Sequence, residues 1–96
     1  MSGYYVIEPC ASANGVEIKL KEKRIELAKA EKALVKLGEI MASMPVVVVA
    51  KVGAYSVSVY GSGRIMVKSE KKPAAKDVNA LAEKLMKALE KEGAIV

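Results

Sequence analysis

The strongest constraint on the fold is an alternation of apolar and other side chains on both sides of one glycine-rich turn. Residues 55–60 and 64–68 carry a Val, Ile or Tyr at every second position, and Gly61-Ser62-Gly63 separates the two segments. A period of two places successive side chains on opposite faces of a β-strand, whereas a helix needs a period near 3.6. The sequence therefore predicts two strands joined by a tight turn, with one apolar face.

Three further segments are also predicted to be strands. Residues 4–8 are β-branched and aromatic before Pro9, and residues 16–20 alternate as residues 55–60 do. Asn14-Gly15 is a turn signal between these two segments, so they form a hairpin. The chain restarts after Pro45 with four consecutive valines, Val46–Val49. A run that is apolar on both faces indicates a central strand or an interface strand.

Two segments follow the helical period instead. Within residues 22–41, apolar residues recur at spacings of three and four, which predicts an amphipathic helix that ends at Gly38 or a few residues later. Residues 75–91 repeat the pattern between Pro73 and Gly93. The predicted order is ββαβββα in a single domain, residues 1–96. We expect an α+β fold, with a curved antiparallel sheet and both helices packed on one face.

The amino-acid composition excludes most kinds of catalytic site. The 96 residues include no His and a single cysteine, Cys10, which excludes an internal disulfide and a multi-cysteine zinc site. Without a histidine to act as its base, Cys10 is expected to be an inert core residue. The glutamates show no paired-carboxylate pattern. We therefore predict that the protein is not an enzyme, and we expect no cofactor, no metal site and no small-molecule substrate.

The sequence also bears on location. No basic start followed by a long apolar segment is present, and the longest apolar run, residues 44–50, falls far short of the roughly 20 residues that span a bilayer. We expect a cytoplasmic protein that does not associate with a membrane. Lys and Glu are abundant, while Gln is absent and Asn occurs twice. Such usage is typical of hyperthermophile proteins.

The protein is strongly basic, with a formal net charge of +5 at pH 7. A basic surface attracts nucleic acid and other polyanions over long range. The alternative is that the lysines only keep the protein in solution.

The predicted sheet has a face that the helices leave uncovered. Strand alternation places these residues on it: Glu17, Lys19, Lys21, Ser56, Ser58, Tyr60, Arg64, Met66 and Lys68. A solvated face, a homodimer or partner surface, and a nucleic-acid surface all fit this mixture of bases, hydroxyls, one aromatic ring and one methionine.

The phrase Tyr60-Gly-Ser-Gly-Arg-Ile-Met-Val67, followed by the helix at 75–91, resembles one repeat of the TATA-box-binding protein. The order of elements agrees along nearly the whole chain, while the sequence match covers residues 57–69. The resemblance implies a fold like half of that protein, and a concave sheet face that binds the DNA minor groove through inserted wedges. It implies that Tyr60 occupies the position of an intercalating Phe. Neighbouring concave positions would be held by Ser56, Ser58, Arg64, Met66 and Lys68.

The departures from that family matter equally. The face is polar here, the wedge carries a hydroxyl, and the second repeat is missing, so TATA recognition is not expected. We expect a homodimer, because a two-fold pairing of identical chains would rebuild the missing half and the two-sided Val46–Val49 strand fits an interface. We predict a small, basic, non-catalytic domain that binds nucleic acid weakly, with Tyr60 stacking on a base. Phosphate contacts are expected from Lys19, Lys21, Arg64, Lys68, Lys71 and Lys72. The alternative is a protein-interaction or homodimerisation module with no role in nucleic-acid binding.

Overall fold

The computed structural model describes residues 5–9, 15–69 and 75–96. Its elements, in chain order, are β1 (Tyr5–Pro9), β2 (Gly15–Leu20), α1 (Leu27–Val35), β3 (Glu39–Ser43), β4 (Val47–Val52), β5 (Tyr55–Tyr60), β6 (Arg64–Lys68) and α2 (Ala75–Lys91). Cys10, Lys71 and Lys72 lie outside the described residues, and so does the predicted turn residue Asn14.

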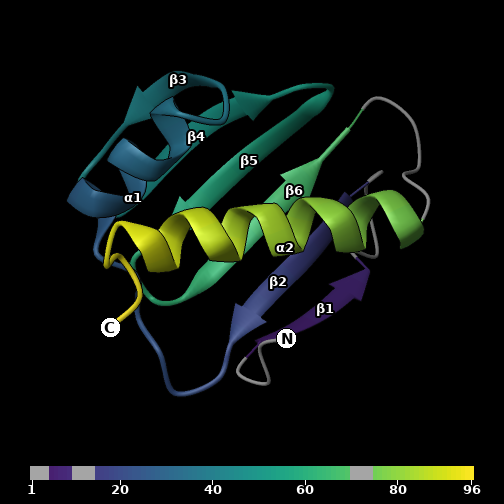
Figure 1. Ribbon diagram of the computed structural model, residues 1–96, viewed down its shortest axis with the longest axis horizontal. Helices are drawn as coiled ribbons and strands as arrows, with labels where there is room; N and C mark the ends of the chain where they lie inside the picture. The colour runs from purple at the N-terminus through teal and green to yellow at the C-terminus, as the bar shows by residue number, and fades with distance from the viewer. Residues whose placement is uncertain (1–4, 10–14, 70–74) are drawn as a thin grey trace.

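The strands form one open antiparallel sheet in the order β1-β2-β6-β5-β4-β3. Figure 1 shows α1 and α2 on the same side of this sheet, with α2 running across the central strands. The predicted α+β class is confirmed, and the predicted strands and helices occur in the predicted order. The structure adds one strand, β3, at an edge of the sheet.

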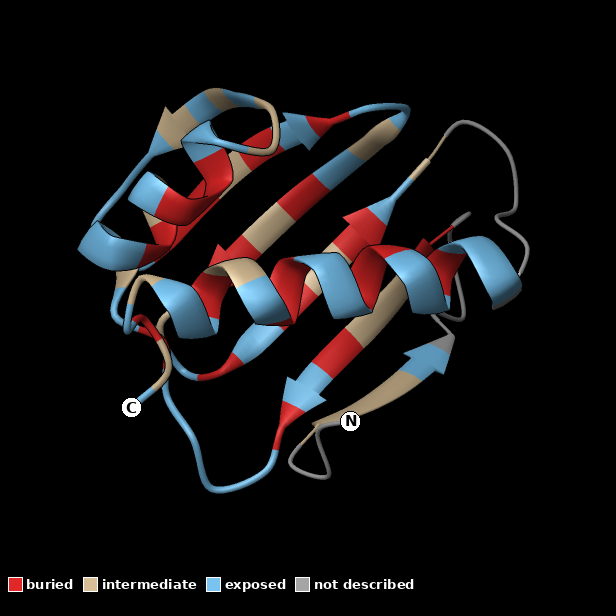
Figure 2. Cartoon of the chain, in the orientation of Figure 1, coloured by how far each residue is buried: buried red, intermediate tan, exposed pale blue. Residues whose placement is uncertain are grey.

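The core lies between the sheet and the helices. Val57, Val59 and Ile65 from the central strands are fully buried, as predicted from their alternation, and they pack with Leu85 and Leu89 from α2. Figure 2 shows the buried residues of α2 on the side that faces the sheet, and the exposed ones on the opposite side. One apolar stripe on the helix is therefore matched to one apolar face of the sheet.

The first helix is shorter than predicted at its N-terminal end. Residues 22–26 are not helical. The C-terminal tail pairs with residues 24–26 of this segment: Arg24 and Val96 exchange two backbone hydrogen bonds of 2.9 Å each. Glu26 donates its backbone N–H to the carbonyl of Ala94 at 2.7 Å. Helix α1 begins at Leu27, the first residue after the segment that is hydrogen-bonded to the C-terminal tail.

The helix also ends earlier than predicted, and residues 39–43 form β3. Lys36 is the C-cap of α1, and Gly38 donates its N–H to Leu34 at 2.9 Å. A side chain at Gly38 would place its Cβ 2.0 Å from the carbonyl oxygen of Lys51 on β4. The glycine thus lets the chain leave the helix directly against β4 and pair with it.

The valine strand begins and ends later than predicted. Val46 is exposed and precedes β4, whereas Val47 and Val48 are buried on opposite faces of the strand. The expected two-sided burial is therefore found, one position further along. Strand β4 continues through Lys51 to Val52, and this extension brings a lysine into the sheet that the predicted strand left out.

An ion pair joins the ends of the two helices. The ammonium of Lys36, after α1, donates a hydrogen bond to the carboxylate of Glu92, just after α2. This hydrogen bond lowers the pKa of Glu92 below its ordinary value, and burial of the carboxyl opposes the shift. Helix α2 then ends in the predicted terminator, Gly93, which adopts a φ of +71°.

Candidate functional site

The face of the sheet opposite the helices carries the candidate site. Cross-strand pairing places Ser58 opposite both Val49 and Met66, and Tyr60 opposite both Val47 and Arg64. We call this surface the open face. Its described members are Val6, Glu8, Gly15, Glu17, Lys19, Glu39, Ala42, Val47, Val49, Lys51, Ser56, Ser58, Tyr60, Arg64, Met66 and Lys68.

One end of the open face is built around Tyr60 and Arg64, which face each other across β5 and β6. The guanidinium of Arg64 lies 5.6 Å from the centroid of the Tyr60 ring, within the range of a cation–π interaction. Its Nε donates to Glu17 Oε2 on β2 at 2.6 Å, and its Nη2 lies 4.0 Å from the sulfur of Met66. The predicted aromatic and basic residues are therefore brought together.

The neighbouring base, Lys19, is also paired within the molecule. Its Nζ lies 3.0 Å from Glu8 Oε1 on β1. The hydrogen bond to Glu8 raises the pKa of Lys19 above its ordinary value, and the negative charges of Glu8 and Glu17 add to the effect. Two bases and two carboxylates meet here, so this end presents little net charge to a polyanion.

The opposite end is different. Ser56 on β5 lies directly between Lys51 on β4 and Lys68 on β6. Adjacent strands are about 4.8 Å apart, so the backbones of the two lysines are about 10 Å apart. Within the described parts of the chain, neither lysine forms an ion pair. Among the described residues, two bases and one carboxylate, Glu39 opposite Lys51, share this end, so it keeps an excess of one positive charge that the other end lacks.

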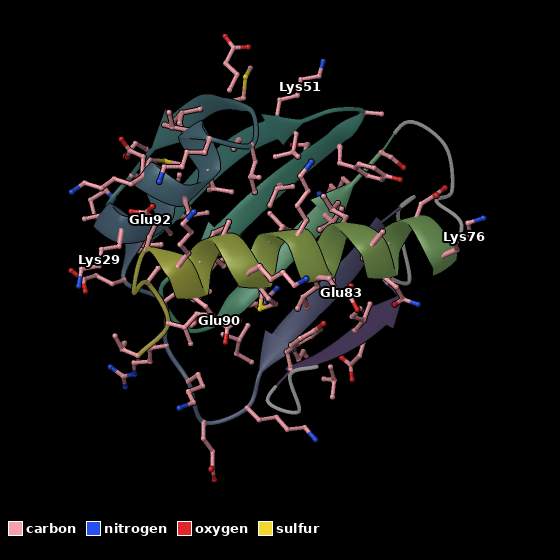
Figure 3. All side chains as sticks on the ribbon, viewed as in Figure 1. Lys29, Lys51, Lys76, Glu83, Glu90 and Glu92 are labelled. Carbon is pink, nitrogen blue, oxygen red and sulfur yellow. The ribbon has the colours of Figure 1, made fainter. Side chains whose placement is uncertain are left out.

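A cleft of about 300 Å³ opens beside this row. It is lined by Met41, Lys51, Ala54, Tyr55, Ser56, Lys68 and Ser69. Figure 3 shows Lys51 projecting from the margin of the sheet, clear of both helices. The lining thus includes two lysines, two serines, a methionine and a tyrosine. Such a set of groups suits a small anion that is attached to an apolar or flat body.

Sequence reasoning missed Lys51 and the cleft. The predicted strand stopped at Val49, although the alternation of positions 47, 49 and 51 continues onto the open face. The sequence pattern predicts a helix at Met41, whereas Met41 lies in β3 at an irregularity in the pairing with β4 and is 59% exposed. The alternation of Glu17, Lys19 and Lys21 predicts Lys21 on the open face, but β2 ends at Leu20 and Lys21 follows it.

In residues 5–9, 15–69 and 75–96, no three or more His, Cys, Asp or Glu side chains gather as a metal site would require. None of the described helices has the length and hydropathy to cross a membrane. Comparisons of the chain with protein-family models, with curated proteins and with solved structures found no match.

Proposed function

We propose that the protein binds single-stranded nucleic acid weakly through the open face. The observation that carries the proposal is the division of this face into two ends. One end has an aromatic ring beside a guanidinium, and the other has two lysines that form no ion pair with any described residue. Single strands are held by this combination, because bases stack on rings while cations follow the phosphates. Tyr60 lies four residues from Ser56 along β5, or about 13–14 Å.

The ion pairs of the face favour a single strand over a duplex. Lys19 and Arg64 are both engaged by carboxylates, so a duplex laid across the sheet would meet Glu8 and Glu17 as well as the bases. A single strand can follow β5, with phosphates toward Lys51 and Lys68 and a base against Tyr60. The resemblance to the TATA-box-binding protein also favours this face as the binding surface, and the resemblance is itself a prediction.

A salt-titrated binding assay with single-stranded and duplex DNA and RNA tests this proposal. Each lost phosphate contact lowers the salt slope of single-strand binding by roughly 0.7. We expect that decrease for Lys51→Gln and for Lys68→Gln, and none for the control Lys84→Gln, an exposed position on α2. Tyr60→Ala should weaken binding roughly 5- to 150-fold, since stacking contributes about 1–3 kcal/mol per base. The absence of binding to all four nucleic acids in low salt would end the proposal.

A second candidate function is homodimerisation, and the edge strand β3 favours it. Among the described strands, β3 pairs with β4 alone, so its other edge offers backbone groups to another strand. Met41, Met44 and Val46 are 59%, 47% and 69% exposed in and beside this strand. We propose that two copies pair through β3 in antiparallel fashion, because a two-fold axis makes such a contact self-complementary.

Light scattering over a concentration series tests the dimer. We expect the mass of two chains at high micromolar concentration. We expect Ala42→Pro to weaken the dimer at least tenfold. Proline cannot donate a backbone hydrogen bond to a second strand, and a proline in an edge strand therefore blocks pairing. Val35→Ser changes an exposed apolar residue on α1 and serves as the control. A one-chain mass at every concentration would contradict this second proposal.

A further inference from the structure

The cleft at the lysine end of the open face carries a further inference. It is separated from the Tyr60 end by the length of β5, and its charged groups come from different strands. Lys51 and Lys68 flank Ser56 in one cross-strand row, so all three project to the same side of the sheet. Their placement is set by backbone register in three adjacent strands and not by a loop.

The charge of the cleft selects the ligand. A phosphodiester carries one negative charge, whereas a phosphomonoester carries about −1.5 to −2 at pH 7 and has three acceptor oxygens. Two ammonium groups without partners in the described chain match a dianion, and they leave an excess of charge on a monoanion. The hydroxyl of Ser56 lies between them as a further donor.

One carboxylate lies near this row and has to be accounted for. Glu39 on β3 is the cross-strand neighbour of Lys51, yet the two form no ion pair and Glu39 does not line the cleft. Lys51 therefore remains available to an incoming anion, in contrast to Lys19 and Arg64.

The size and walls of the cleft limit what the phosphate is attached to. A volume of about 300 Å³ is at the lower end of the range for ligand pockets, roughly 300–1,000 Å³, so a single nucleotide unit is the scale of ligand that fits. Met41 and Tyr55 supply an apolar and aromatic surface next to the lysines. A base or sugar can pack against that surface while the phosphate meets the two ammonium groups.

We propose that this cleft binds a phosphomonoester, either the terminal phosphate of a nucleic-acid strand or the phosphate of a free nucleoside monophosphate. The inference rests on the proposed function, because it names the group that one end of the same face would take. A strand whose terminal phosphate sits between Lys51 and Lys68 would run along β5 toward Tyr60. The open face would then have a direction, with the strand end at the cleft.

The test compares three oligonucleotides of one sequence, labelled internally, with a phosphate at the 5′ end, at the 3′ end, or at neither. Fluorescence anisotropy at constant salt measures their affinities, and calorimetry measures a nucleoside monophosphate against its nucleoside. We expect one phosphorylated end to bind at least about tenfold more tightly than the unphosphorylated strand, since hydrogen bonds to charged groups are the strong ones. Binding of the monophosphate as tightly as the strand would identify the free nucleotide as the source.

The variants decide whether the cleft is responsible. Lys51→Gln and Lys68→Gln should each abolish the preference for the phosphorylated end, whereas Lys51→Arg and Lys68→Arg should keep most of it. Lys84→Gln should leave the preference unchanged, which separates a site from a general effect of added charge. Equal binding of all three oligonucleotides would overturn the inference and leave the proposed function standing. A preference that survives both glutamine variants would overturn it as well.

Two further outcomes distinguish failure of the proposed function from failure of the inference. If no oligonucleotide binds but the monophosphate does, and Lys51→Gln removes that binding, the cleft is a phosphomonoester site and the proposed function fails. If neither kind of ligand binds, both proposals fail together.

Discussion

Replacing Leu85 with alanine is expected to lower the free energy of unfolding by about 2–5 kcal/mol. Leu85 is completely buried in the middle of α2, where it packs against the apolar face of the sheet. The substitution removes buried methyl groups and leaves a cavity that the surrounding strands and helix fill only in part. A domain of this size has a total stability of roughly 5–15 kcal/mol, so the loss is a large fraction of it.

Urea unfolding followed by circular dichroism measures the effect, and an unchanged m-value shows that the midpoint shift reports stability. Lys68→Ala on the open face is the matched control and should cost less than about 0.5 kcal/mol. Val57→Ala, fully buried on β5, should lie between the two. If Lys68→Ala destabilised the protein as strongly as Leu85→Ala, the assignment of covered and open faces would be wrong.

Gly63→Ala is the second substitution with a large expected effect, about 3 kcal/mol of lost stability. Two independent costs combine at this position. Gly63 adopts a φ of +97°, in the region that L-residues with a side chain rarely occupy. A Cβ there would also lie 2.3 Å from the backbone carbonyl oxygen of Lys23, so the chain that covers the turn would have to move.

The surroundings of Gly63 leave little room for that movement. Leu20 donates its N–H to the carbonyl of Gly63 at 2.8 Å, and Ile25 donates to Gly61 at 3.1 Å. Gly53→Ala is the matched control, because Gly53 has a φ of +62° but nothing within 4 Å of a Cβ. It carries only the conformational cost, about 1 kcal/mol. Equal losses for both variants would show that segment 20–25 does not press on the turn.

Some features of the candidate site follow from the local sequence, and others depend on tertiary contacts. Tyr60, Arg64 and Lys68 were placed on the open face by alternation alone, because side-chain direction in a strand is a local property. Their partners were not predictable in this way. Arg64 reaches Glu17, which is 47 positions earlier in the chain, only because β2 and β6 are neighbours with a particular register. Because Lys19 and Arg64 are paired with carboxylates, the bases of the open face that form no ion pair with a described residue are Lys51 and Lys68. Sequence reasoning did not select Lys51.

The sequence by itself determined the α+β class, the hairpin of residues 55–68, the helix at 75–91 and the side of the sheet that is buried. Each of these depends on a hydrophobic period that is present within one segment, so no distant contact is needed to infer it. The tertiary structure decided the rest. Residues 24–26 are extended because the C-terminal tail bonds to them, and residues 39–43 form a strand because β4 offers an edge to pair with. Backbone hydrogen bonds to distant partners override a helical pattern that the same residues display on their own.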